Sequence, residues 1–230
     1  MKEVRDRKLL DHFIKKYQFA SIFPESFLEY LTLYSFERGE LICSQGQASS
    51  NLFVLVEGKF KVYRTSPEGR TLILSFETPV ALIGDIEFVQ NTNIINTVAA
   101  VSTGYLFGAN YQVINRYMGN FAPFLKYLLK MITKKFYVEE YSFNFNLMYP
   151  VEVRLASYLL SVSFEEPETE SAQSINISDI ASLIGTSYRH MNRVLTKFCD
   201  EGLVERKRGL IKIKNRDGLE AYASRSIYEP

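Results

Sequence analysis

The chain has 230 residues, of which 47% are hydrophobic and 23% are charged, and its formal net charge of +1 excludes a polycation. No run approaches the roughly 18 consecutive apolar residues that a membrane span requires, so we expect no membrane association. The charged first eight residues are followed by no apolar signal segment, which predicts a cytoplasmic protein.

The N-terminal half is predicted to begin with short helices and to continue as many short strands. Apolar residues between Leu9 and Tyr17 share one helical face, and Pro24 opens a second helix over residues 25–33. From Tyr34 to Phe107 the apolar period becomes two, as in the short runs 52–56, 59–63 and 72–76. Glycines punctuate this stretch at turn-like intervals, at positions 39, 46, 58, 69, 84, 104 and 108. Short strands with glycine corners predict a sandwich or a rolled barrel.

A long apolar helix is predicted past Gly119, with Pro123 in its first turn. Two neighbouring stripes of mostly apolar residues leave this helix no large solvated side. The first stripe consists of Leu125, Leu129, Ile132, Phe136, Glu140 and Phe143, and the second of Phe121, Phe124, Leu128 and Met131. One face can pack on the strand domain, and a symmetric copy of the helix is the simplest partner for the other. The alternative is a core helix of one compact domain.

The C-terminal third has the pattern of a winged helix-turn-helix. Tyr149-Pro150 ends the long helix, another helix is expected over 151–164, and an acidic loop over 165–171. Asn176 can cap the next helix, with Asp179 three residues later, and Gly185 ends it. Ser187 can cap the helix after that, whose inward face carries Met191, Val194, Leu195 and Phe198. Two strands around Arg208-Gly209 complete a wing.

Basic residues concentrate in this region, since the segment between Thr186 and Arg216 contains nine Lys and Arg but only three Asp and Glu. Charge alone would fit an ordinary solvated face, but a helix-turn-helix with a basic wing is a more specific combination. Side chains in the first turns of such a helix reach base edges and phosphates in a major groove, and basic wing residues lie against phosphate. The predicted DNA-binding residues are Thr186, Ser187, Tyr188, Arg189, His190, Asn192, Arg193, Lys197, Lys207 and Arg208.

Motifs along nearly the whole chain resemble those of Crp/Fnr transcription regulators. The pattern Phe36-x-x-Gly39-x-x-Ile42-x-x-x-Gly46, followed later by Ile83-Gly84-Asp85, resembles their cyclic-nucleotide-binding β-roll. The segment from Asp179 to Leu195 resembles their helix-turn-helix, and its Thr-Ser-Tyr-Arg-His core is most similar to the YeiL branch. The resemblance implies an α+β fold with a β-roll sensor over 1–118, a dimerisation helix over 119–148 and a winged helix-turn-helix over 149–230.

The resemblance implies DNA binding but not the family's usual operator. Relatives carry Arg-Glu before a later Arg on the recognition helix, whereas this chain has Tyr188-Arg189 and keeps the later residue as Arg193. Arg189 and Arg193 are therefore the candidates for bidentate guanine contacts. We expect a homodimer whose recognition helices enter successive major grooves roughly 34 Å apart, a palindromic site in double-stranded DNA, and RNA polymerase as a candidate further partner.

The effector cannot be read from the sequence. Relatives that bind cyclic nucleotides follow the Gly84-Asp85-Ile86 type of turn with an Arg-Ser or Arg-Thr pair, but no Arg or Lys lies between Ala81 and Arg116. A buried phosphate without a cation is costly, so cyclic AMP is not expected. The candidate effector pocket consists of Gly84, Asp85, Ile86, Ile94, Ile95 and Asn96. An unidentified small molecule, a response through Cys43, or no ligand at all remain open.

No cofactor is expected. An iron–sulfur cluster needs about four thiolates, and the chain has only Cys43 and Cys199, whose separation also argues against a disulfide framework. Haem would need an axial ligand, and the two histidines are His12 and His190. Two other classes are alternatives. One is an adaptor that binds protein, in which the basic wing has no role. The other is an enzyme, for which G-x-S-x-G, H-E-x-x-H, Walker and dinucleotide motifs are missing.

Overall fold

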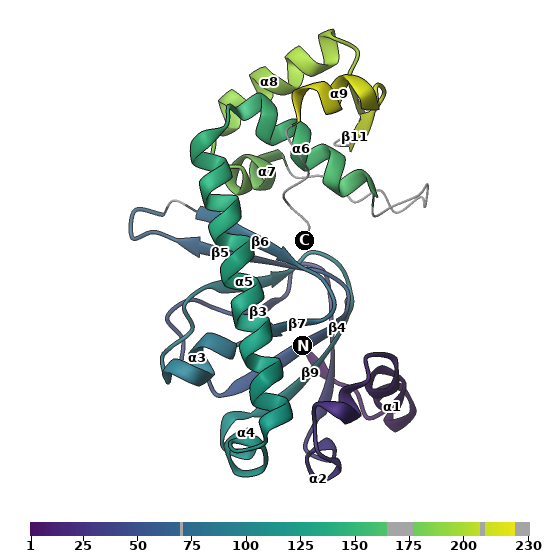
Figure 1. Cartoon of the computed structure of the whole chain (residues 1–230), viewed down its shortest axis with the longest axis vertical. Helices are drawn as coiled ribbons and strands as arrows, with labels where there is room; N and C mark the ends of the chain where they lie inside the picture. Colours follow the sequence, from purple (N-terminus) through teal and green to yellow (C-terminus); the bar gives the residue numbers. More distant parts are fainter. Residues whose placement is uncertain (70, 165–176, 208–209, 224–230) are drawn as a thin grey trace. The chain divides into compact units, whose positions relative to one another are not determined.

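The computed structural model describes residues 1–69, 71–164, 177–207 and 210–223, and the chain divides into two compact units. The N-terminal unit spans Met1–Lys135 and the C-terminal unit spans Phe136–Pro230. Helix α5 (Ala122–Met148) runs through the boundary, so each half belongs to a different unit (Figure 1). Within the described ranges, no helix is long and apolar enough to cross a membrane.

Two antiparallel sheets form the N-terminal unit and confirm the rolled β-architecture. The first has the order β1-β2-β9-β4-β7, with β1 (Lys2–Glu3), β2 (Thr32–Phe36), β9 (Gly104–Asn110), β4 (Asn51–Glu57) and β7 (Ala81–Ile83). The second has the order β3-β8-β5-β6, with β3 (Leu41–Cys43), β8 (Thr97–Ala100), β5 (Phe60–Thr65) and β6 (Thr71–Glu77). Both sheets contribute to one buried cluster, which includes Phe36, Ile42, Leu55, Phe60, Val98 and Leu106.

Strand β4 is buried on both faces, which explains why residues 52–56 are apolar without alternation. Leu52, Val54 and Val56 belong to an aromatic-rich cluster with residues of the flanking helices, whereas Leu55 belongs to the cluster shared by the two sheets. Successive strand residues point to opposite faces. Because each face of β4 packs against one of these buried clusters, residues on both faces are apolar.

Helices cover one side of the first sheet. They are α1 (Arg7–Lys16), the 3-10 turn η1 (Phe19–Ser21), α2 (Glu25–Leu28) and α4 (Tyr111–Met118), while α3 (Asp85–Gln90) follows β7. The expected apolar face of α1 is confirmed, since Leu10, Phe13 and Ile14 are buried. The helix expected over 25–33 is wrong beyond Leu28. From Thr32 onward the backbone pairs with β9, with Thr32 opposite Gly108, so strand pairing overrides the local helical signal.

Two of the seven glycines do not lie at turns, contrary to the sequence interpretation. Gly104 and Gly108 lie inside β9. A Cβ at Gly104 would collide with the Glu57 carbonyl oxygen, and one at Gly108 would lie 2.9 Å from the Phe53 ring. Both glycines permit close approach of neighbouring groups rather than a change of chain direction.

The C-terminal unit is a winged helix-turn-helix, as expected. It contains α6 (Val151–Phe164), α7 (Ile177–Leu183), α8 (Tyr188–Asp200), the antiparallel pair β10 (Val204–Lys207) and β11 (Leu210–Ile213), and α9 (Arg216–Tyr222). Its buried residues include Leu155, Ile180, Val194, Leu195, Phe198 and Leu219. The proposed cap Asn176 and the acidic loop over 165–171 lie outside the described residues.

Candidate nucleic-acid interface

The turn between α7 and α8 is built as the sequence predicted. Gly185 adopts a φ of +66°, which favours glycine, and the chain leaves α7 there. The Ser187 hydroxyl oxygen accepts the backbone N–H of His190 at 3.2 Å, so Ser187 is confirmed as the N-cap of α8. The cap fixes where α8 starts and therefore which side chains occupy its first turns.

A buried arginine holds the end of α7, a role that sequence reasoning missed. The Arg154 guanidinium on α6 donates to the Ile184 carbonyl and lies 3.4 Å from that of Gly185. Asn146, in the last turns of α5, donates to the Leu183 carbonyl at 3.2 Å. The last carbonyls of a helix have no partner within it, so these two side chains stabilise the turn. The available signal was a charged residue on the apolar side of the helix over 151–164.

Helix α8 has one apolar and one polar face. Met191, Val194, Leu195 and Phe198 are buried, as their spacing predicted. Among the predicted DNA-binding residues, Ser187, Tyr188, Arg189, Arg193 and Lys197 are exposed, and Thr186, His190 and Asn192 are half-buried. The structure therefore brings all eight together around one helix.

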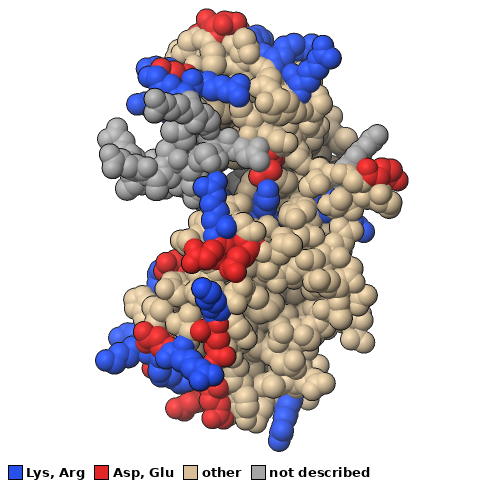
Figure 2. Space-filling view, turned by 180° about the vertical axis from the view of Figure 1, so that it is seen from behind, with Lys and Arg blue, Asp and Glu red and all other residues tan. Residues whose placement is uncertain are grey.

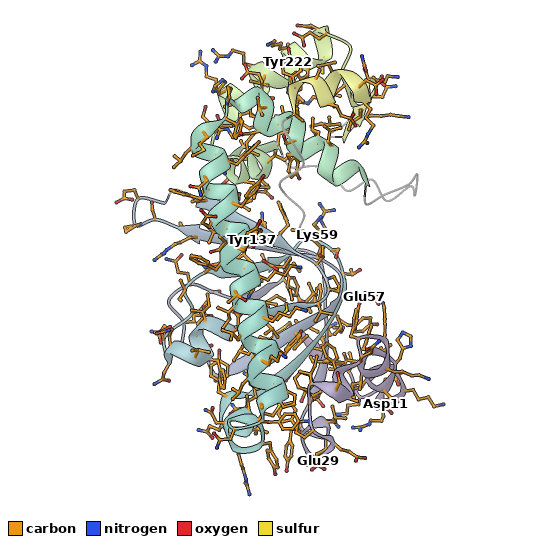
Figure 3. The ribbon with its side chains drawn as sticks, in the orientation of Figure 1. Asp11, Glu29, Glu57, Lys59, Tyr137 and Tyr222 are labelled. Atoms are coloured by element: carbon orange, nitrogen blue, oxygen red, sulfur yellow. The ribbon has the colours of Figure 1, made fainter. Side chains whose placement is uncertain are left out.

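The cationic side chains among these residues differ in whether they already interact with other groups of the protein. Arg189 and Arg193 have no ion pair with any described residue. Lys197 lies 5.3 Å from the centre of the Tyr222 ring, and hydrogen bonding with Tyr222 raises the pKa of Lys197. Tyr222, at the end of α9 (Figure 3), also contacts the Phe198 ring with centroids 5.1 Å apart. The two arginines are thus the more available cations.

The wing carries paired charges. Glu205 binds Lys207 at 2.8 Å and Lys214 at 3.3 Å, and these hydrogen bonds lower the pKa of Glu205. On the neighbouring residue, Arg206 Nη1 donates to Asn192 Oδ1 of α8 at 3.0 Å. Arg208 lies outside the described residues. Figure 2 shows Lys and Arg side chains on the surface, with Asp and Glu side chains among them.

In the N-terminal unit, the candidate effector region contains a cation that the sequence window between Ala81 and Arg116 did not include. Lys135 of α5 lies 2.9 Å from both carboxylate oxygens of Asp85 and donates to the Leu82 carbonyl at 2.6 Å. The side chain of Asp85 is only 3% exposed. The expectation that no cation lies near this turn was therefore wrong, although this ammonium is already bound to Asp85.

One of the other candidate effector residues, Ile95, binds a second buried carboxylate. Glu87 accepts the backbone N–H of Ile95 at 2.9 Å. Ile94 is buried, Ile86 is exposed, and Gly84 is the left-handed residue before α3. The amide oxygen of Asn96 is buried with no hydrogen-bond partner among the described residues.

Cys43 lies beside this region. Its sulfur is 3.9 Å from the Asn96 carbonyl oxygen, and burial, followed by the charge of Glu87, raises the pKa of Cys43 to about 11. Both Cys43 and Cys199 are free thiols. Over the described part of the chain, no group of His, Cys, Asp and Glu could hold a metal ion.

Comparisons with known proteins agree with this geometry. A cyclic nucleotide-binding domain matches residues 33–120, and a Crp-like helix-turn-helix domain matches residues 153–222. The regulatory protein YeiL of Escherichia coli O157:H7 is 28% identical over 196 residues, which cover 83% of this chain and 85% of that protein. A CRP-like cAMP-activated global transcriptional regulator of Mycobacterium tuberculosis is 18% identical over 190 residues, covering 80% of this chain and 84% of that one.

Solved structures share the fold. A CRP-family transcriptional regulator from Thermus thermophilus superposes with a TM-score of 0.73 at 20% identity, covering 85% of this chain and 99% of that one. FixK2 from Bradyrhizobium japonicum gives a TM-score of 0.70 at 17% identity, covering 84% and 98% of the two chains.

Proposed function

Because the chain belongs to the Crp/Fnr family and is a transcription regulator with a helix-turn-helix DNA-binding domain, we propose that it acts as a homodimer on a palindromic site in double-stranded DNA. We assign residues 1–118 to the sensor, 119–148 to the dimerisation helix and 149–230 to DNA binding. The cytoplasm is the proposed location and RNA polymerase a proposed partner. No catalytic reaction is proposed, since the curated relatives are named as regulators.

The observation that carries this proposal is the two-faced character of α8. Four apolar side chains fix the helix to its own domain, while Arg189 and Arg193 extend from the exposed side without an ion-pair partner among the described residues. A bidentate Arg–guanine contact discriminates by about 1–3 kcal/mol. We therefore assign base reading to Arg189 and Arg193, and assign phosphate contacts to Lys207 and Arg208 of the wing.

The exposed apolar face of α5 supports the homodimer. Leu129, Phe136, Phe143 and Leu147 are 63%, 72%, 64% and 70% exposed. Tyr137 of the same helix, labelled in Figure 3, is 64% exposed. Burial of large apolar side chains against a second copy would remove them from water, each with a gain of about 1.5–3 kcal/mol. Sedimentation tests this: Phe136→Glu should shift the chain toward the monomer, and unchanged dimerisation would count against the assignment.

We infer that cyclic AMP is not the effector, because the turn that would hold its phosphate is already engaged. The Ile95 N–H donates to Glu87, and the Lys135 ammonium is bound to Asp85 and to the Leu82 carbonyl. The sequence between Ala81 and Arg116 contains no Lys or Arg. A phosphate would have to displace a buried carboxylate of like charge. Calorimetry is the test: no heat of binding is expected at micromolar cyclic AMP, and saturable binding would contradict the inference.

DNA binding itself is tested by selecting bound fragments from genomic DNA and titrating salt. The selected fragments should share a palindrome with half-sites about one helical turn apart. Arg193→Ala should reduce the ratio of affinities for selected and random duplexes. Lys207→Ala should weaken both affinities alike and reduce the salt slope by about one. An unchanged ratio in Arg193→Ala would refute base reading by this residue.

A further inference from the structure

Arg206 is a wing cation whose side chain contacts α8. Along β10, Val204 is buried, and Arg206, two residues later, lies on the same side of the strand. Glu205 and Lys207 point to the other side, where they bind each other. The Arg206 guanidinium instead reaches α8 and donates to Asn192 Oδ1 at 3.0 Å.

This contact determines how the Asn192 amide is oriented. A guanidinium group has only donors, so the amide atom that faces Arg206 must be the oxygen. The amide nitrogen, which is donor-only, then faces away from Arg206. Hydrogen bonding from Asn192, and then from Arg206, lowers the pKa of Tyr188, which lies one helical turn earlier. Asn192 is thereby held between Tyr188 and Arg206, with its oxygen engaged.

We propose that Arg206 is a positioning residue that presents Asn192 to DNA as a hydrogen-bond donor, so that the contacted base is guanine or thymine rather than adenine. This rests on the proposed DNA-binding function. An unrestrained asparagine pairs with adenine by accepting from N6 and donating to N7. With the Arg206 guanidinium bound to its oxygen and one N–H directed at Tyr188, Asn192 offers DNA its second N–H donor, which suits base edges that present acceptors: N7 and O6 of guanine, or O4 of thymine.

The competing role for Arg206 is a simple phosphate contact. Phosphate contacts fix register but carry no sequence information. Loss of such a contact would weaken binding to all sequences alike and reduce the salt slope. Loss of a positioning residue would instead change the base preferred at one position, and that position would be the one read by Asn192. The base preference therefore separates the two roles, and affinity alone does not.

The test is selection from a randomised duplex library by the full-length chain and matched variants. Asn192→Ala should abolish the preference at one position of each half-site, where the wild type selects guanine or thymine. Arg206→Met should shift the preference there toward adenine by roughly 5- to 10-fold, because the freed amide oxygen can accept from N6. Arg206→Lys keeps a donor beside Asn192 and should retain the wild-type base. Lys212→Ala, on the opposite side of the wing, is the control and should leave all preferences unchanged.

Three outcomes would overturn the proposal. One is a wild-type preference for adenine at the Asn192 position, which needs no Arg206 variant. Another is an Asn192→Ala variant that selects the same bases as the wild type. The third is an Arg206→Met variant that binds every sequence more weakly with unchanged preference, since that result assigns Arg206 to phosphate. A wild-type chain that selects no sequence at all would refute the proposed function instead.

Discussion

Breaking the ion pair between Lys135 and Asp85 should cause a large loss of stability, most of which a second substitution at Asp85 should restore. Lys135→Met keeps most of the aliphatic stem but removes the ammonium, which lies 2.9 Å from both Asp85 oxygens and 2.6 Å from the Leu82 carbonyl oxygen. Because the Asp85 side chain is 3% exposed, water cannot replace these contacts without rearrangement. Breaking a buried pair from one side costs about 3–5 kcal/mol. We expect the free energy of unfolding of the N-terminal unit to fall by that amount.

The matched rescue is Asp85→Asn in the Lys135→Met background. The neutral amide removes the unpaired charge, so the double variant should lose only about 1–2 kcal/mol relative to the wild type. Urea unfolding followed by circular dichroism, at one fixed protein concentration because a dimer is proposed, measures all three chains. A loss below about 1 kcal/mol in Lys135→Met, or a double variant no more stable than the single one, would show that the ion pair does not stabilise the N-terminal unit.

Three further predictions concern other charged or buried groups. Glu205→Gln frees Lys207 and Lys214, so affinity for DNA of any sequence should rise about 3- to 10-fold at low salt, with a steeper salt dependence; an unchanged slope in a salt titration would contradict this. Tyr127→Phe removes a buried hydroxyl that has no hydrogen-bond partner among the described residues, so the free energy of unfolding at pH 7 should rise by about 1 kcal/mol. A clear decrease in that free energy would contradict this prediction. Burial raises the pKa of Tyr127 from 10.0 to about 12, so the unfolded chain releases this proton at lower pH than the folded chain does. The free energy of unfolding of the wild type should therefore fall between pH 10 and pH 12, and that of Tyr127→Phe should fall less in the same urea series. The raised pKa of Cys43, about 11 against an ordinary 9.0, predicts alkylation at pH 8 about a hundredfold slower than in the unfolded chain, as measured by mass spectrometry; equal rates would exclude a protected thiol.

The sequence predicted the elements whose residues repeat at a regular period. Helix α8 is the clearest case, because Met191, Val194, Leu195 and Phe198 occur at the spacing that one buried helical face requires, and Ser187 precedes them as a cap. The polar face followed from the same periodicity. Helix α6 was likewise bounded by Tyr149-Pro150, where the chain cannot continue a regular helix.

Tertiary contacts between distant residues could not be predicted in the same way. Lys135 and Asp85 are 50 residues apart, and only the register of α5 against β7 and α3 brings them together. Arg206 meets Asn192 because the wing folds back onto α8. The residues after Leu28 carry a local helical pattern, but pairing with β9 decides their structure. In each case the deciding residues are distant in the sequence, so a pattern read from neighbouring residues does not include them.

Tethered cleavage tests most directly whether the polar face of α8 enters a DNA groove. Thr196 is exposed on α8 and lies seven residues after Arg189, on the same face, but is assigned no contact. In a Cys43→Ser, Cys199→Ser chain, Thr196→Cys can carry an iron chelate that cuts nearby DNA. On a selected duplex, we expect two cleavage centres related by two-fold symmetry and about one helical turn apart. A bound complex that cuts evenly along the duplex, or not at all, would contradict it.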